Sequence, residues 1–374
     1  MNRTPASRPT LAVGISSAPR ELAVLGPLLE AARSAVGDVP ALLKLATAAA
    51  DIAPLPGGGR TPFLWEILAS VTAVDVAAGR AIEPHLDATA IRAQASSHAS
   101  AQASDHPGVE SSPDQDSARQ GCAWGVFAAE APGLRLTASP VDGRFLLRGT
   151  KPWCSLAAQL DYAVLTAHLD DGGRAAFAVD LHASGVSFED PQWTSRGLRE
   201  IPSGSVHFDA VPAVPLGDAG WYYRRPGFAW GGMGVAACWL GGAVAVARGF
   251  KESLRQAADG GRAPDQIALA HLGEIDRTLA ALTGYFARTA GRIDAGHLAG
   301  SGAWSEALRV RGATATAVER IQTLVSQNLG PGPLAFDEVY AKRMADLSLY
   351  IRQHHAMRDD AQLGALTLKG DHPW

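Results

Sequence analysis

The sequence predicts an α+β protein in which a small β-domain lies between two helical regions. The outer parts of the chain carry apolar residues at the three- and four-residue spacing of helices, whereas residues 121–217 alternate apolar and polar residues over short runs. Turn sequences such as Asp142-Gly143 separate those runs. Helices, then strands, then helices indicate segregated layers and not a βαβ repeat. We therefore expect an N-terminal helical domain (1–120), a middle antiparallel β-barrel or sandwich (121–217) and a C-terminal helical bundle (218–374).

The composition favours a soluble protein. A chain of 374 residues with 47% hydrophobic content is long enough for two or three domains with sizeable cores. Its net charge of −4 gives no electrostatic case for nucleic acid or an anionic membrane. The three cysteines lack CxxC spacing, which indicates a reducing compartment and no structural metal. No signal peptide or confident membrane span is recognised, so a cytoplasmic location is expected.

The N-terminal region shows helical periodicity over residues 20–50. A further helix is expected from Pro62 toward Arg80. Pro84 should kink or split this helix before a second piece that ends near Ile91, because proline cannot donate the helical hydrogen bond.

Residues 94–121 are rich in Ser, Ala, Gln and Asp and contain almost no large apolar residue. Such a segment buries too little surface to order itself, so we expect a flexible loop that leads into the β-domain. His98 and His106 lie in this segment, and we interpret them as solvated loop residues and not as metal ligands.

The β-domain carries one compact polar-aromatic motif, residues 151–155 (Lys-Pro-Trp-Cys-Ser). The expected strands around it are 134–137, 144–148, 162–166, 175–179 and 204–208.

The C-terminal region predicts a bundle of long helices. The first begins near Phe228, and the others are expected at roughly 264–293, 302–329 and 334–365, with a sharp break at residues 328–333 (Asn-Leu-Gly-Pro-Gly-Pro).

Three segments resemble the acyl-CoA dehydrogenase family of flavoproteins. They are residues 127–132 (Phe-Ala-Ala-Glu-Ala-Pro), 149–155 (Gly-Thr-Lys-Pro-Trp-Cys-Ser), and 197–199 (Gly-Leu-Arg), which leads into 206–211. The resemblance implies that FAD is the cofactor. It also implies that Trp153 packs on the isoalloxazine ring and that Ser155 donates a hydrogen bond near flavin N5.

The same resemblance assigns further cofactor contacts. Ala129 and Glu130 would lie near the pyrimidine edge of the flavin. The run 327–333 (Gln-Asn-Leu-Gly-Pro-Gly-Pro) is similar to the family's Gln-x-x-Gly-Gly-x-Gly loop, so Gln327 and Gly330 would reach the FAD of a neighbouring subunit. A homo-oligomer (dimer or tetramer), or a heteromer with a related subunit, is therefore expected.

The family's catalytic glutamate is missing from both of its usual places. Continued without a gap, the resemblance puts His354 at the position of this glutamate in the last helix. The alternative position, in the helix from Phe228 to Phe250, contains no acid. Because a neutral imidazole can act as a general base at pH 7, His354 is the candidate proton-transfer residue. His355 would point about 100° away on a helix, and a pair of partly exposed structural histidines is the competing interpretation.

Two other segments depart from the family pattern. Pro132 is followed by Gly133-Leu-Arg-Leu where the family has Gly-Ser-Asp, and residues 263–273 replace an Arg-x-Phe-Gly segment. These departures affect the expected contacts with the FAD pyrophosphate and with coenzyme A.

Three functions remain open at this point. The leading hypothesis is an FAD-dependent oxidoreductase of the acyl-CoA dehydrogenase type that acts on an acyl thioester or a related small molecule. The second is a flavin-dependent monooxygenase or oxidase that uses His354, and the third is a non-catalytic subunit or scaffold. A hydrolase triad of Ser155, His354 and Asp346 is disfavoured because no Gly-x-Ser-x-Gly turn is present.

Overall fold

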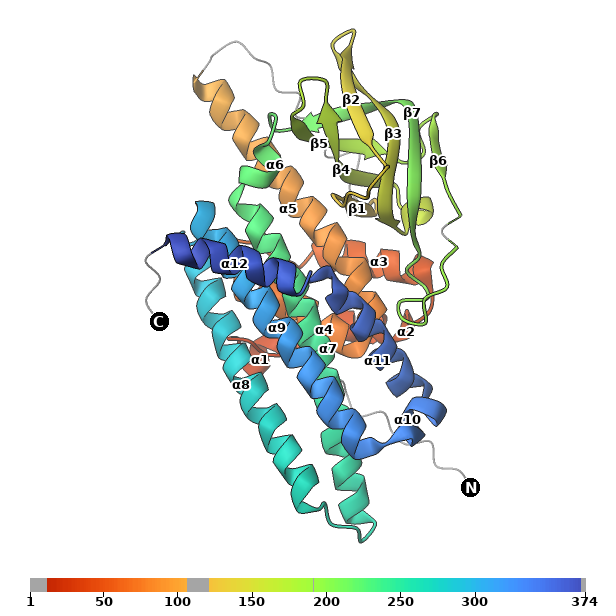
Figure 1. Ribbon diagram of the computed structural model, residues 1–374, viewed down its shortest axis with the longest axis vertical. Coiled ribbons are helices and arrows are strands. Elements are labelled where there is room, and N and C mark those ends of the chain that lie inside the picture. Colours follow the sequence, from red (N-terminus) through yellow and green to blue (C-terminus); the bar gives the residue numbers. More distant parts are fainter. Residues whose placement is uncertain (1–11, 106–120, 191, 371–374) are drawn as a thin grey trace.

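The computed structural model describes residues 12–105, 121–190 and 192–370. Helices form the N-terminal region. Their bounds are α1 (Pro19–Leu22), η1 (Ala23–Leu25), α2 (Gly26–Ser34), α3 (Val39–Ala50), α4 (Thr61–Val74) and α5 (Val76–Asp105). Figure 1 shows α5 running from the helical layer along one side of the β-domain.

The break between α4 and α5 falls at Asp75 and not at Pro84. Asp75 has extended backbone dihedrals, and its Oδ1 accepts a hydrogen bond from the Ala78 backbone N–H at 2.9 Å. Such a contact is typical of a helix N-cap. Pro84 remains inside α5.

The loop expected from residue 94 is also wrong as far as Asp105, because α5 continues to that residue. Alanine has the highest helix propensity, and an exposed helical face needs no large apolar residue. Ser97 Oγ donates to the Ala93 carbonyl at 3.0 Å within the same helix. His98 Nε2 lies 2.7 Å from Asp218 Oδ1, and His106 lies outside the described residues.

The middle domain is built of strands. They are β1 (Trp124–Phe127), β2 (Leu136–Val141), β3 (Arg144–Ser155), β4 (Tyr162–Leu169), β5 (Arg174–Asp180), β6 (Val186–Phe188) and β7 (Ser203–Leu216). The pairings β4–β2, β2–β3, β3–β7, β7–β5 and β5–β4 close into a barrel, as predicted, with β1 and β6 added at β4 and β7.

The barrel is not purely antiparallel, contrary to the prediction. β4 pairs in parallel with both β1 and β2. Strand β3 reverses the direction of β2, and the turn around η4 (Ala157–Gln159) reverses it again, so β4 runs the same way as β2 beside it.

The C-terminal region is a helical bundle. Its elements are α6 (Trp221–Arg224), α7 (Pro226–Asp259), α8 (Gln266–Asp294), α9 (Gly300–Leu329), α10 (Pro331–Phe336), α11 (Glu338–Tyr350), η5 (Ile351–Gln353) and α12 (Met357–Lys369).

The single helix expected over 334–365 is wrong. It is interrupted at Asp337, whose side chain caps α11, and again between η5 and α12, where Ala356 has a φ of 49°. His354 and His355 therefore lie in an irregular turn and not on a helix.

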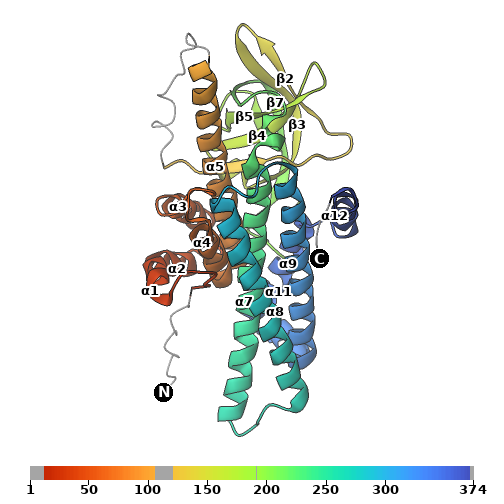
Figure 2. The same cartoon turned by 90° about the vertical axis from the view of Figure 1, so that its left-hand side faces the viewer.

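Helix α7 is the central helix of the protein. Figure 2 shows α1–α4 on one side of it and α9, α11 and α12 on the other. Among the described residues it is the one helix long and apolar enough to cross a membrane, but 72% of its most apolar window is buried inside the protein.

The crossing of α4 and α7 depends on Gly241. A Cβ at this position would lie 2.0 Å from the Ala69 carbonyl oxygen, so the two backbones must separate to admit it. We expect Gly241→Ala to destabilise the protein by about 1–3 kcal/mol, measured by urea unfolding. Gly249→Ala, in the same helix with no atom within 4 Å of the new Cβ, is the matched control and should be neutral or stabilising. Equal stability of the two variants would contradict the close crossing.

Candidate functional site

A cavity of about 820 Å³ lies between the β-barrel and the helices. The helical side is formed by Arg80, Glu83, Pro84 and Asp87 of α5, Val235 of α7 and Arg311 of α9. The barrel side includes the end of β1, the segment 128–130, and Trp153, Ser155 and Ser203. Trp193, Leu198 and Ile201 also line the cavity, and so do residues around 349–355. This volume lies within the ordinary range for small-molecule sites.

Trp153 is presented to the cavity by a bulge in β3. Lys151 pairs with Val206 and Cys154 with Gly204, so β3 carries one residue more than β7 between these pairs. Bulges of this kind turn a side chain away from its regular direction. Trp153 adopts a φ of 59°, and the residue is 59% exposed. The sequence motif therefore places an uncovered indole on the cavity wall.

Ser155 lies at the end of β3, beside Trp153 on the same wall. Its Oγ accepts a hydrogen bond from Arg80 Nη2 at 3.0 Å and lies 2.7 Å from Ser203 Oγ. These contacts join the helical wall to the barrel wall.

Two carboxylates face the cavity from α5, one helical turn apart. Glu83 is 9% exposed, and burial raises its pKa to about 7, with Arg80 opposing and Asp87 adding to the shift. Arg80 Nη1 lies 3.9 Å from Glu83 Oε2. Burial also raises the pKa of Asp87, against the effect of Arg225, whose Nη2 lies 3.8 Å away. A carboxyl group with a pKa near neutrality in a cavity is suited to proton transfer.

Glu83 and Asp87 escaped the sequence prediction. A signal was present, because Arg80, Glu83 and Asp87 recur at helical spacing within a largely apolar stretch. Their suitability for proton transfer depends on the barrel, which lies against this face of α5. The local sequence pattern does not reveal that contact.

Arg311 supports the same wall from α9. Its Nη1 donates to the Gly232 carbonyl at 3.1 Å and its Nη2 to the Gln353 carbonyl at 2.6 Å. It thereby ties α7 and the turn after α11 to α9 at the edge of the cavity.

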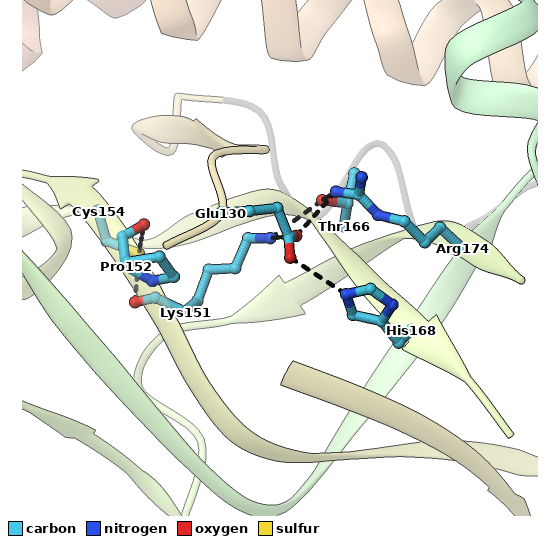
Figure 3. Close-up of polar contacts among 7 residues, drawn as sticks. All are labelled: Glu130, Lys151, Pro152, Cys154, Thr166, His168 and Arg174. Carbon is cyan, nitrogen blue, oxygen red and sulfur yellow. Dashed lines mark hydrogen bonds and ion pairs between the residues drawn. The ribbon is translucent and has the colours of Figure 1, made fainter. Parts of the chain in front are cut away.

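Ala129 and Glu130 both line the cavity, but the carboxylate of Glu130 is committed to an ion-pair cluster (Figure 3). Its oxygens lie 3.0 Å from Lys151 Nζ, 3.1 Å from His168 Nε2 and 2.8 Å from Arg174 Nη2. Although partial burial opposes it, the hydrogen bonds from Lys151 and His168 lower the pKa of Glu130. This cluster ties the segment 128–131 to the buried Lys151, two residues before Trp153, and so positions the cavity wall.

His354 is not among the residues that line the cavity, whereas His355 is. The His354 side chain is 8% exposed and Nε2 lies 3.8 Å from Asp359 Oδ2, without a hydrogen-bond partner in the described part of the chain. It faces Gly312 of α9, where a Cβ would lie 3.5 Å from Nε2. Burial lowers its pKa, against the effect of Asp359. The structure thus places His354 behind the wall and not on it.

Asp346 forms no triad with His354 and Ser155. Its carboxylate accepts hydrogen bonds from Lys342 Nζ and from the Leu198 backbone N–H, both at 2.6 Å.

Gln327 and Gly330 lie at the far end of α9 from the cavity. Arg311 marks the cavity on this helix, and residues 311–327 span about 24 Å at ~1.5 Å per residue. One chain therefore does not bring Gln327 and Gly330 together with Trp153 and Ser155. Within the described ranges, no group of three or more His, Cys, Asp and Glu side chains is placed to hold a metal ion.

Comparisons with known proteins agree with this architecture. Residues 128–211 match the family model described as acyl-CoA dehydrogenase, middle domain. A sequence comparison with curated proteins gives no match.

Solved structures match over almost the whole chain. Dibenzothiophene monooxygenase (TdsC) from Paenibacillus sp. A11-2 is 18% identical, with a TM-score of 0.72, and the match covers 95% of this chain and 98% of that one. Butyryl-CoA dehydrogenase from Megasphaera elsdenii is 16% identical, with a TM-score of 0.72 and coverage of 91% and 97%. KijD3, in complex with FMN and a dTDP-amino-keto sugar, is 18% identical, with a TM-score of 0.74 and coverage of 98% of both chains. These findings confirm the predicted fold and the resemblance to the acyl-CoA dehydrogenase family.

Proposed function

We propose that this chain, which has the acyl-CoA dehydrogenase fold and a matching middle domain, is a flavin-dependent oxidoreductase in which Glu83 transfers the proton. One observation carries the proposal. The exposed indole of Trp153, the hydroxyl of Ser155 and the buried carboxylate of Glu83, with a pKa of about 7, line one cavity.

The barrel wall suits a flat heteroaromatic group. The uncovered face of Trp153 offers stacking, and the Ser155 hydroxyl beside it offers a hydrogen bond to a ring atom. A flavin bound there would supply hydride or oxygen chemistry. The family resemblance predicts FAD, whereas FMN is the flavin named for TdsC and KijD3.

Glu83 supplies the acid–base group that the usual family positions lack. It lies on the helical wall and Trp153 on the barrel wall, so a substrate between them would meet both. In a dehydrogenation, the ionised Glu83 carboxylate would take the proton α to a carbonyl, and a bound flavin would supply the acceptor for the hydride from the neighbouring carbon. A pKa of about 7 leaves a substantial ionised fraction at neutral pH.

The substrate is a small, mostly apolar molecule. Val126, Ala128, Val235 and Leu349 contribute apolar surface to the cavity, and Trp193 adds an aromatic side. An acyl thioester or a related carbonyl compound is the first candidate. The second is an oxygenation substrate, and it is favoured by the similarity to dibenzothiophene monooxygenase over nearly that whole chain.

The test begins with the absorption spectrum of the purified protein, before and after incubation with FAD or FMN, and with chromatography of the released chromophore. Trp153→Ala should weaken flavin binding about tenfold, because it removes the stacking surface. Phe336→Ala, at a 91% exposed position of α10, is the control and should bind normally. Protein that takes up neither flavin overturns the proposal.

The two candidate reactions are then separated by their requirements. Bleaching of the bound flavin by an acyl-CoA under anaerobic conditions identifies a dehydrogenase. Oxygen-dependent product formation by the reduced protein from an aromatic substrate panel identifies a monooxygenase.

A further inference from the structure

We propose that Arg80 and Ser203 are positioning residues that direct the hydrogen of the Ser155 hydroxyl into the cavity and strengthen it as a donor. The inference rests on the proposed function, because the acceptor is an electron-rich atom of the bound flavin. Neither residue belongs to the motif that contains Ser155. They come from α5 and from the start of β7.

The argument begins with the capacity of one hydroxyl group. Serine Oγ can accept two hydrogen bonds and donate one. Arginine can only donate, so the Arg80 guanidinium, 3.0 Å away, must occupy one lone pair of Ser155 Oγ. The remaining lone pair and the hydrogen of Ser155 are left for Ser203 and the cavity.

Ser203 decides how that remainder is used. Its Oγ lies 2.7 Å from Ser155 Oγ, and its other acceptor, the Ile201 carbonyl, is at 3.4 Å. The 2.7 Å contact leaves the direction of donation open, and an acceptor in the cavity that takes the Ser155 hydrogen selects donation from Ser203 to Ser155. Both lone pairs of Ser155 are then filled, and its hydrogen is free to bond an acceptor in the cavity.

Arg80 adds charge to this geometry. Its side chain is 13% exposed, so solvent screens the guanidinium little. A hydroxyl that accepts from a cation is polarised and becomes a stronger donor. Glu83 Oε2, 3.9 Å from Arg80 Nη1, and the Tyr350 ring, 5.8 Å from the guanidinium carbon, hold the cation in place.

This hydrogen bond should stabilise the reduced, electron-rich form of the flavin more than the oxidised form. A strong donor with a cation behind it stabilises an acceptor more when that acceptor carries more negative charge. Reduction of a flavin increases the negative charge on its ring atoms. Arg80 and Ser203 therefore make the bound flavin easier to reduce.

The experiment measures the reduction potential of the bound flavin by dye equilibration, in wild type, Arg80→Met, Arg80→Lys, Ser203→Ala and Ser155→Ala. We expect more negative potentials in Arg80→Met, Ser203→Ala and Ser155→Ala, with Arg80→Lys between wild type and Arg80→Met. Arg144→Met, at an exposed position of the β2–β3 hairpin, should keep the wild-type potential.

The outcomes are distinguishable. Wild-type protein that binds no flavin contradicts the proposed function. Flavin-bound Arg80→Met and Ser203→Ala proteins with wild-type potentials overturn this inference alone. If Arg80→Met fails to fold because Glu83 loses its cation, the double variant Arg80→Met/Glu83→Gln replaces it, compared with Glu83→Gln.

Discussion

Glu83→Gln is expected to lower turnover by about 10²–10⁴-fold while the flavin stays bound. The amide keeps the shape and polarity of the carboxyl group but cannot accept a proton from the substrate. Because Trp153 and Ser155 lie on the opposite wall, the spectrum and affinity of the flavin should change little. Turnover is measured on the substrate that the acyl-CoA or aromatic panel identifies.

The pH dependence of turnover is a second test of the role of Glu83. Burial raises the pKa of Glu83 to about 7, so the ionised base accumulates as the pH rises through this value. Activity that needs the base should therefore rise across about pH 6–8 in the wild type, and this limb should disappear in Glu83→Gln. Asp87→Asn should move the limb to lower pH, because the Asp87 carboxylate raises the pKa of Glu83.

His354→Ala provides the matched comparison. His354 lies behind the cavity wall, so we expect this variant to keep most of its turnover. Loss of activity in His354→Ala with full activity in Glu83→Gln would reverse the assignment and restore the histidine as the proton-transfer residue.

Glu66→Ala is expected to reduce the free energy of unfolding by about 3–5 kcal/mol. Glu66 is fully buried on α4, and its Oε1 accepts hydrogen bonds from the backbone N–H groups of Ile15, Ser16 and Ser17, each at 2.8 Å. Ser17 Oγ donates to the other carboxylate oxygen. The variant leaves these donors without their acceptor and detaches residues 15–17 from α4.

Glu66→Gln separates the effect of charge from that of the oxygen acceptor. Its amide retains one carbonyl oxygen, so we expect a smaller loss of about 1.5–3 kcal/mol. Glu338→Ala, at an exposed position of α11, should change stability by less than about 1 kcal/mol. Urea unfolding checks all three variants. A loss for Glu66→Ala no larger than that for Glu338→Ala would contradict the role of the buried carboxylate.

Local patterns were sufficient for much of the fold. The alternation around residues 144–148 and 162–166 predicted β3 and β4, and helical spacing predicted α8 and α9. Side-chain period is a property of one segment, so it needs no knowledge of the neighbours. The same patterns failed beyond residue 94, where α5 continues although residues 96–101 are exposed or only partly buried.

The sequence by itself placed Trp153 and Ser155 two positions apart in one strand of the barrel wall, whereas the bulge that turns the indole outward comes from the pairing of β3 with β7. Only the tertiary structure decided the opposite wall. Glu83 acquires a pKa of about 7 because the fold buries this face of α5 against the cavity, and Ser155 meets Arg80 only where α5 crosses the barrel rim. The turn after α11 likewise moves His354 off the helical position that a continuous pattern had suggested. Burial and charge at a site depend on segments distant in sequence, and so they arise only when the chain has folded.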